Sequence, residues 1–522
     1  MALPDASATN LTPKRGGTFR LRGEDPTGFD PHLVPNHPRT MTNLSFTHSR
    51  LVKIRAGPSV SPGTLPIEPD LAESWTQPNS TTYVFTLRKG VRWHDKAPVS
   101  GRELTAEDVK YTYERFLTVK GNPTRAALDP LERIDVVARY TVKLTLHEPC
   151  AWFLDYLATT LMWIIPREAV ELHGDLRKAE VCIGTGPLML ERYEPGVRLS
   201  FVRNPNYFLA GLPYVDAVQV IIDDDPASRL AAWLSGAYDF APEYGMCVRR
   251  IDLDVAKTRK PGLQTQEFTS LVGDMTMMKI DKAPFKDLRV RRALALARSW
   301  REELNANANS VGVGVPNATV PTALKEWSVP IDQLSPRGRQ LYEQDLPEAR
   351  KLLAQAGYPQ GFKTVLEATQ GFGSDYLDGL QVIARSWKEA GVTAELNLKE
   401  FGAFMASTFI GKFPTIAHSL RGGTTVADAY LYGFHLPGQA FNTAGVDDSK
   451  LARMILLQRS TSDRAKRREL VCDIQRYLAE QAYYLYGPSA TAIAAWEPYV
   501  KNFAPNLGHD YGGRLMVSWL DK

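Results

Sequence analysis

The sequence predicts an α/β protein built from more than one lobe, and three observations lead to this prediction. The chain has 522 residues, which exceeds the ~250–300 residues at which a single hydrophobic core stops growing. Segments with the period of a strand alternate with segments that have the period of a helix. Hydrophobic residues make up 44% and charged residues 23%, which excludes a disordered, collagen-like or coiled-coil chain.

Strands and helices are predicted from their periodicity and from the residues at their ends. The predicted strands are residues 18–22, 82–88, 141–146, 197–202 and 392–398. The predicted helices begin at Thr105 or span residues 225–236, 345–357 and 376–390. Thr105 and Asp108 have capping-box spacing, in which each residue satisfies a free amide at the start of the helix.

Charge and hydropathy exclude several classes of partner. The 62 basic and 58 acidic residues are interspersed, and the net charge is +4, so neither nucleic acid nor a membrane surface is indicated. The basic run at residues 289–292 is interpreted as one solvated face. The longest apolar run, residues 153–165, contains Asp155 and is shorter than the ~20 residues of a membrane-spanning helix.

The N-terminus and the cysteines leave alternatives open. Residues 1–15 are predicted to form a flexible arm without the pattern of a signal peptide. They fit a cytoplasmic protein or a mature secreted chain with an added Met1. Four widely spaced cysteines argue against a zinc site. A Cys150–Cys182 disulfide is compatible with an oxidising compartment, and buried free thiols explain the same residues.

Motifs that would indicate catalysis, metal binding or a cofactor are missing. The sequence has no HExxH, GxSxG or P-loop motif. Residues 312–316 lack the third glycine of a dinucleotide fingerprint and are predicted as a loop. Residues 184–187 are predicted as a turn into a strand, and Asp223–Asp225 as a solvated loop that caps a helix. We therefore predict no enzyme, no metal and no cofactor. Ten tryptophans and 21 tyrosines suit a protein that grips a small ligand.

A series of motifs resembles the family-5 extracellular solute-binding proteins of ABC transporters, in the order that family shows. The motifs are residues 67–75, 83–95, 104–109, 184–187, 203–207, 225–229, 236–239, 284–293 and 349–357. Each motif alone is mostly structural, but the ordered series is hard to obtain by chance. The family serves importers of peptides, nickel chelates, opines and some oligosaccharides.

The resemblance implies a two-lobed periplasmic-binding-protein fold with a hinge of two crossing strands and a ligand cleft between the lobes. Lobe I would comprise residues 16–45, 190–268 and 487–522, with an accessory subdomain at 46–189. Lobe II would comprise residues 269–486. It also implies capture of a peptide, opine or oligosaccharide-like solute by lobe closure, an ABC permease as partner, and a monomer. The location would be periplasmic or extracellular, with a lipid anchor on the precursor.

The resemblance places ligand-binding residues in one loop of the second lobe. Asp428 matches the aspartate of the family's Asp-Pro pair, while Gly423 and Thr424 are neutral where peptide binders carry an acidic residue. A peptide with a free amine is therefore disfavoured unless the loop shifts and Asp428 serves. Nickel is disfavoured because Gly423 replaces an aromatic residue and Phe441 replaces a histidine. The guanidinium group of Arg421 is suited to bind a carboxylate or a phosphate through paired hydrogen bonds. The alternative is that Arg421 forms an ion pair on the surface.

Four further residues are predicted to line the ligand site. Met41 lies where the family has a methionine in its cleft, and His48 is a second candidate from the same lobe. Tyr244 is expected to face the cleft or to lie in the core. Phe372, between two glycines, is predicted to supply a ring from the second lobe. The functions that compete with solute capture are a periplasmic chaperone, a sensory receptor on the same fold, and a hydrolase.

Overall fold

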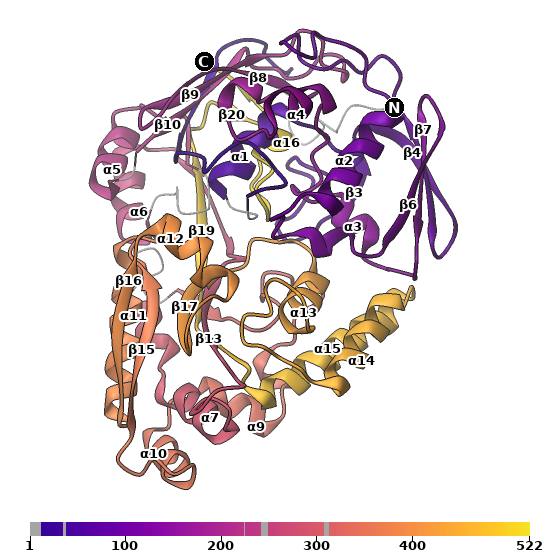
Figure 1. Cartoon of the computed structure of the whole chain (residues 1–522). Coiled ribbons are helices and arrows are strands. Elements are labelled where there is room, and N and C mark those ends of the chain that lie inside the picture. Colours follow the sequence, from indigo (N-terminus) through magenta and orange to yellow (C-terminus); the bar gives the residue numbers. More distant parts are fainter. Residues whose placement is uncertain (1–11, 35–37, 224, 242–248, 307–312) are drawn as a thin grey trace. The chain divides into compact units, whose positions relative to one another are not determined.

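The computed structural model describes residues 12–34, 38–223, 225–241, 249–306 and 313–522 (Figure 1). It divides into two compact units. Unit 1 comprises Met1–Val248, Asp252–Glu267 and Ile493–Lys522, and unit 2 comprises Arg249–Ile251 and Phe268–Ala492. Most of the predicted flexible arm, residues 1–11, lies outside the described residues. The ligand cleft and the closure of the lobes stay predictions.

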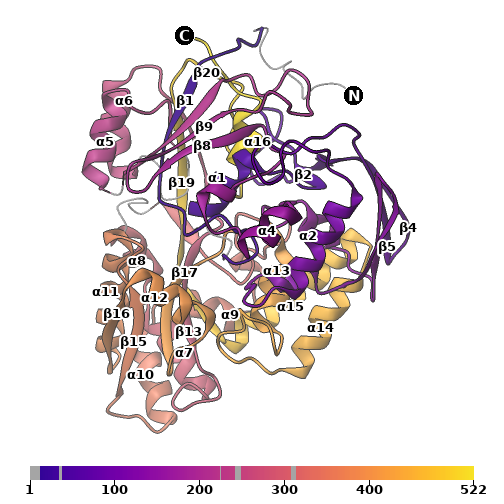
Figure 2. The ribbon, with the colours of Figure 1, turned by 45° about the horizontal axis from the view of Figure 1, so that its top comes forward.

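Unit 1 is organised around a large mixed sheet. Its strand order is β12-β19-β11-β1-β10-β9-β8. The bounds are β1 Thr18–Gly23, β8 Leu188–Glu194, β9 Arg198–Arg203, β10 Ala217–Ile222, β11 Phe240–Ala241, β12 Gln264–Thr269 and β19 Pro488–Trp496. β1 runs parallel to β10 and β11, whereas β8, β9 and β10 are joined as an antiparallel meander. Helices α5 (Pro226–Leu234) and α6 (Leu253–Arg259) lie together beside this sheet (Figure 2).

A second, antiparallel sheet in unit 1 has the order β4-β5-β7-β6. Its strands are β4 Ala72–Asn79, β5 Thr82–Leu87, β6 Leu131–Ala138 and β7 Thr141–Leu146. Helix α2 (Ala106–Thr118) packs against it and buries Val109, Tyr113 and Phe116. The Thr105 amide donates to Asp108 Oδ2 at 2.8 Å, which confirms the acidic half of the predicted capping box. The smaller elements of unit 1 are α1 Pro38–Thr47, β2 Val52–Ile54, β3 Ile67–Pro69, α3 Phe153–Leu157, α4 Arg167–His173, β20 Val500–Lys501, α16 Tyr511–Leu515 and β21 Trp519–Leu520.

The turn predicted at residues 184–187 is confirmed, and it packs directly on the end of α1. Gly186 donates its amide to Thr47 O at 2.9 Å. A Cβ atom at Gly184 would lie 1.9 Å from Thr47 O. His94 is fully buried, and its Nδ1 accepts a hydrogen bond from the Gly184 amide at 3.2 Å. The ring proton is therefore on Nε2, which donates to Gly186 O at 3.2 Å. The glycines of this motif are therefore required for close backbone packing.

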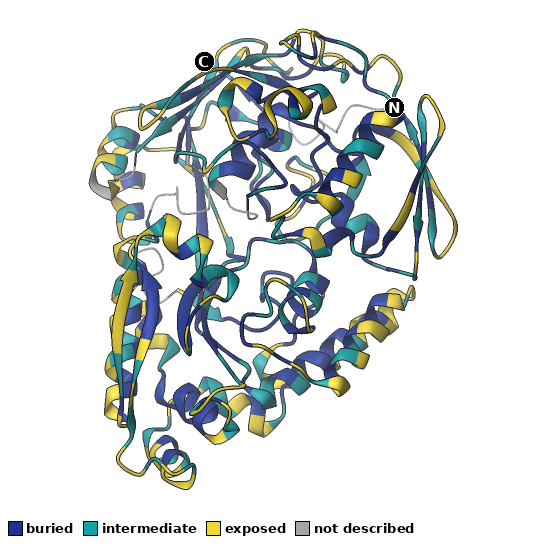
Figure 3. Cartoon of the chain, in the orientation of Figure 1, coloured by how far each residue is buried: buried dark blue, intermediate teal, exposed yellow. Residues whose placement is uncertain are grey.

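Unit 2 contains a five-stranded sheet with the order β16-β15-β17-β13-β18. Its strands are β13 Gly273–Met278, β15 Phe362–Thr369, β16 Val392–Lys399, β17 Ile416–Arg421 and β18 Tyr484–Tyr486. β15 pairs in parallel with β16 and β17, and β13 pairs antiparallel with β17 and β18. The inner strands β13 and β17 are buried, whereas β16 is largely exposed (Figure 3).

Helices cover this sheet and extend from it. Their bounds are α7 Leu288–Ala297, α8 Trp300–Ala306, α9 Pro336–Arg339, α10 Leu346–Gln355, α11 Ser374–Glu389, α12 Phe401–Ala406, α13 Ala427–His435, α14 Ser449–Ser460 and α15 Arg464–Gln481. α7, α10 and α11 enclose a core with Val290, Leu353 and Trp387 at its centre. α14 and α15 pack side by side (Figure 1).

Two predictions for unit 2 are wrong. The run at residues 289–292 is not one solvated face, because Arg291 and Arg292 are 5% and 6% exposed. Arg291 donates to four backbone carbonyls, including Ala482 O at 3.1 Å, and thereby ties α7 to the end of α15. The predicted loop at 312–316 contains the short strand β14, Gly314–Pro316, which pairs with β19. Gly312 lies outside the described residues.

We predict that Gly184→Ala lowers the free energy of unfolding by at least about 1–3 kcal/mol, because the new Cβ must displace the backbone at Thr47. Urea unfolding measures this change. Gly379→Ala in α11 is the control, since nothing lies within 4 Å of its ideal Cβ. The control should be neutral or stabilising by about 0.5–1 kcal/mol. Equal stability of Gly184→Ala and the wild type would contradict the packing described above.

Acid should destabilise unit 1 through its buried histidines. Burial lowers the pKa of His48 to about 4 and the pKa of His94 to about 3. Below the ordinary pKa of 6.5 the unfolded chain binds protons that the folded chain does not, so stability falls as the pH falls. We expect a loss of about 1.4 kcal/mol per pH unit for each such histidine between about pH 6.5 and pH 4.

Urea unfolding across this pH range measures the slope. The exposed His147 is the control, because its side chain lies on the surface, where its Nε2 lies 3.0 Å from Asp129 O. His147→Gln should keep the slope of the wild type. A flat profile between pH 6.5 and pH 4.5 would show that the buried histidines do not control acid stability.

Candidate ligand-binding site

Arg421 occupies the end of β17 in the interior of unit 2. It pairs with Gly273 of β13 in the antiparallel ladder, and only 6% of the residue is exposed. Alternation along the two strands places Met275 and Met277 on the same face as Arg421. Nη2 of Arg421 lies 3.1 Å from Met277 Sδ and also donates to Phe409 O. The sheet therefore holds the guanidinium group on a face that also carries two methionine side chains.

Aromatic rings surround this guanidinium. Its carbon lies 3.8 Å from the ring centroid of Phe409 and 5.7 Å from that of Phe441. Phe434 stacks on Phe441 with centroids 5.8 Å apart, and Tyr430 stacks on Phe434 at 6.0 Å. Tyr430 and Phe434 share one face of α13 because they are four residues apart. Ring faces stabilise a desolvated cation but do not neutralise its charge.

Arg421 has no acidic partner among the residues that the structure describes. Its Nε is buried and has no hydrogen-bond acceptor there. Burial lowers the pKa of Arg421 to about 9, because desolvation disfavours the charged form and no anion offsets it. A buried arginine without a counter-charge is costly to the fold. An anion that enters from solution would supply the missing charge.

A small cavity adjoins Arg421, with a volume of about 10 Å³. Met275, Asn317, Tyr430, Phe434 and Tyr486 contribute to its lining. Asn317 is 4% exposed, and its Oδ1 has no hydrogen-bond partner in the described part of the chain. The cavity thus brings an unsatisfied donor, Arg421, and an unsatisfied acceptor, Asn317, to one place.

Asp428 was predicted as a ligand contact, and the structure places it in a buried ion pair. The residue is fully buried in the first turn of α13. Its Oδ2 lies 3.2 Å from Arg459 Nε, and its Oδ1 accepts a 2.6 Å hydrogen bond from Gln458 Nε2. Arg459 also lies over the Tyr432 ring, 3.6 Å from the centroid. These contacts fasten α13 to α14, so a role of Asp428 in holding a ligand amine would require them to break.

The other predicted residues of unit 2 fall into two groups. Gly423 and Thr424 lie in the loop after Arg421, where Gly423 has a φ of 93° and Thr424 O accepts a 2.9 Å hydrogen bond from the Tyr430 hydroxyl. Phe441 lies beside Arg421, as described above. Phe372 packs instead into a ring cluster with Tyr376, Phe401 and Phe404.

The predicted residues of unit 1 lie on or just after α1. Met41 is fully buried, and His48 is 3% exposed. His48 Nδ1 lies 2.8 Å from Thr47 Oγ1, so the ring belongs to the packed end of α1. Tyr244 lies outside the described residues. A role of Met41 and His48 in binding a ligand stays a prediction.

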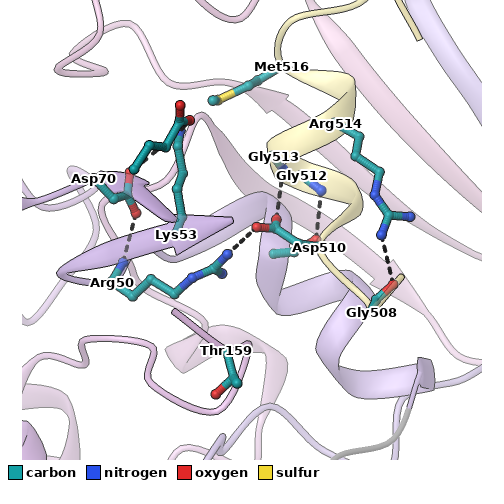
Figure 4. Close-up of polar contacts among 12 residues, drawn as sticks. Arg50, Lys53, Asp70, Thr159, Gly508, Asp510, Gly512, Gly513, Arg514 and Met516 are labelled. Carbon is teal, nitrogen blue, oxygen red and sulfur yellow. Dashed lines mark hydrogen bonds and ion pairs between the residues drawn. The ribbon is translucent and has the colours of Figure 1, made fainter. Parts of the chain in front are cut away.

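Unit 1 has a buried charged cluster of its own, shown in Figure 4. Arg50 forms an ion pair with Asp510, and the Arg50 amide donates to Asp70 Oδ2 at 3.0 Å. Asp510 Oδ1 also accepts the Gly513 amide of α16 at 2.8 Å. Lys53 lies 3.8 Å from Asp70 Oδ1. Each charge therefore has a partner of opposite sign, unlike that of Arg421, and the cluster holds unit 1 together.

Three other predictions concern metals, membranes and cysteines. The described residues contain no group of three or more histidine, cysteine, aspartate or glutamate side chains that could hold a metal ion. No described helix is long and apolar enough to cross a membrane. Of the two alternatives for Cys150 and Cys182, the structure has the buried thiols and no disulfide between them. Cys182 Sγ lies 3.4 Å from Thr47 Oγ1.

Several residues of the Arg421 site were missed at the level of sequence. Tyr430 and Phe434 carried a usable signal, since their spacing places two rings on one face of a helix directly after Asp428. No signal in the sequence set Phe409 apart from the other aromatic residues. Asn317 lies in a segment more than 100 positions before Arg421, and only the sheet brings the two together.

Two α/β units, one with a buried cationic site lined by rings, define a ligand-binding protein. Residues 66–442 match the model of the bacterial extracellular solute-binding proteins, family 5. The match covers more than half of the chain, and the chain belongs to this family of ABC-transporter binding proteins. The resemblance inferred from the ordered motifs is thereby confirmed.

Individual relatives extend over nearly the whole chain. Di/tripeptide-binding protein 1 of Pseudomonas aeruginosa (strain UCBPP-PA14) is 27% identical over 511 residues, which is 92% of this chain and 89% of the relative. The periplasmic binding protein AgaA of A. tumefaciens R10, solved in complex with agropinic acid, is 25% identical with a TM-score of 0.82, covering 97% and 99% of the two chains. The periplasmic binding protein DppA of Helicobacter pylori, solved with the peptide STSA, shares the fold with a TM-score of 0.83 at 22% identity over 98% and 99% of the chains.

The buried ion pair between Asp428 and Arg459 gives a prediction for the stability of unit 2. Asp428→Asn removes the partner of Arg459 and should destabilise unit 2 by about 3–5 kcal/mol, because it leaves a buried charge unpaired. Denaturant unfolding measures the change. Gln458→Leu is the control: it removes the neutral hydrogen bond to Asp428 but keeps the Asp428–Arg459 ion pair, and it should cost less. If Asp428→Asn unfolded at the same denaturant concentration as the wild type, the ion pair would not be what holds α13 against α14.

Proposed function

We propose that this chain captures a small peptide-like or opine-like solute outside the cytoplasm and delivers it unchanged to an ABC permease in the membrane. Family membership supports the role of solute capture. The relatives described above include one named for di- and tripeptides and one solved with agropinic acid. The protein would act as a monomer in the periplasm or at the cell surface, with a lipid anchor on its precursor.

The observation that carries the proposed ligand class is the uncompensated charge of Arg421. Peptides with a free C-terminus and opine acids both carry a carboxylate, which is the planar anion that a guanidinium group binds best. The rings of Phe409, Phe434 and Phe441 form an apolar wall against which the body of such a solute can pack. A neutral oligosaccharide would leave Arg421 without an anion.

Native mass spectrometry of the purified protein tests the proposal. We expect one small molecule per chain, released on denaturation and identified by its mass and fragmentation as a peptide or an opine-like acid. A second sample, unfolded and refolded without the solute, should take up an added peptide or opine and unfold at a higher temperature. The proposal fails if neither sample binds any peptide or opine offered, if only a sugar binds, or if the added solute is chemically converted.

A further inference from the structure

We propose that the hairpin of α14 and α15 in unit 2 binds the surface of a bilayer that contains acidic lipids. Two exposed leucines would enter the interfacial region of the bilayer, and the basic side chains beside them would contact the lipid phosphates. The two helices pack side by side and are joined by residues 461–463 (Figure 1). This contact does not involve the solute, so it goes beyond the proposed function.

The outer face of α14 exposes two large apolar side chains. Leu456 is 43% exposed and Leu457 is 53% exposed, whereas Leu451 and Ile455 on the opposite face of the helix are buried. Arg453 precedes the two leucines by three and four positions, so it lies on their face of the helix. About half of each leucine remains in water, and contact with an apolar phase would remove that surface from water.

Basic residues flank the leucines along the hairpin. Residues 449–468 contain seven basic side chains and one acidic side chain, Asp463, so the even mixing of charge along the whole chain does not hold here. Lys450, Arg453 and Lys466 are exposed and have no acidic partner among the described residues. Asp463 caps α15 and accepts the Lys466 amide at 2.8 Å. This surface is cationic and is therefore complementary to an anionic partner.

Three other arginines of the hairpin have partners within the protein. Arg459 forms the buried ion pair with Asp428. Arg464 forms two hydrogen bonds with the carboxylate of Glu326, at 2.6 and 2.7 Å. Arg467 is buried and donates to the backbone carbonyl of residue 461 at 2.9 Å. These arginines serve the fold, and the exposed cations without acidic partners remain for an external partner.

The composition of the surface favours lipid over a protein partner. Protein interfaces concentrate their binding energy in Trp, Tyr and Arg, and leucine is under-represented there. Residues 449–468 contain no Phe, Trp or Tyr, and the apolar part of the surface is a pair of leucines. A helix at a membrane interface buries such leucines at the acyl boundary, while lysine and arginine reach the headgroups. Each basic residue near an anionic membrane strengthens binding by about fivefold.

Co-sedimentation of the purified chain with lipid vesicles tests this contact. We expect binding to vesicles made of equal parts of phosphatidylglycerol and phosphatidylcholine. Binding to vesicles of phosphatidylcholine alone should be at least about tenfold weaker, because the charge contribution is lost. Raising the ionic strength from about 0.1 M to about 0.5 M should release most of the bound protein, since salt screens exposed charges.

Two double variants separate the apolar contribution from the charged one. Leu456→Ser combined with Leu457→Ser should weaken binding to the anionic vesicles by about tenfold, because less apolar surface leaves water. Lys450→Gln combined with Arg453→Gln should weaken binding by about 25-fold. All four side chains are exposed, so the melting temperature of each variant should stay within about 2 °C of the wild type.

Lys363→Gln combined with Lys388→Gln is the matched control. It makes the same change in net charge at exposed positions of β15 and α11, and it should bind the vesicles like the wild type. The inference is overturned if neutral and anionic vesicles bind alike, if the hairpin variants bind like the wild type, or if the control weakens binding equally. It is also overturned if polyglutamate binds more tightly than the anionic vesicles, which would indicate an acidic protein partner. Solute capture by the purified chain would leave the proposed function standing in each case.

Discussion

The buried ion pair between Arg50 and Asp510 is the interaction on which unit 1 depends. The two residues are 460 positions apart, so this pair brings the C-terminal segment back to the beginning of the fold. A second contact forms at the same place, since the Gly512 amide donates to Ser45 Oγ at 2.8 Å. Unit 1 cannot be completed until the last residues of the chain have been made.

This closure has a consequence for unit 2, which is formed almost entirely by the continuous segment Phe268–Ala492. The chain leaves unit 1 through β12 and returns through β19, and both boundaries fall within strands of one sheet. The elements around Arg421 are therefore close in sequence to one another, apart from β13 and the segment of Asn317. Unit 2 can organise its cationic site from its own strands and helices, independently of the long-range closure of unit 1.

The sequence predicted the elements better than it predicted the site. β7 was predicted with both its bounds, and the Asp345 cap and Gly357 delimit α10 as expected, because these signals are local. The exposure of Arg291 was misjudged, because its carbonyl acceptors come from the distant end of α15. Arg421 was predicted to bind an anion or to form a surface ion pair; the surface ion pair is wrong, because Arg421 is buried, and anion binding stays a prediction. The missing counter-charge depends on which acids the fold brings near Arg421. Local pattern cannot supply that information.

Arg421 and Arg459 differ in how the fold treats a buried positive charge. Both side chains are buried in unit 2, and both lie over an aromatic ring, at 3.8 Å from Phe409 and 3.6 Å from Tyr432. Arg459 has the carboxylate of Asp428, and its cost is met within the fold. Arg421 has no such partner among the described residues, so its cost persists in the free protein. A fold that tolerates such a charge gives up stability at that position, and binding an anion recovers it. Under the proposed function, the same energy would become affinity for an acidic solute.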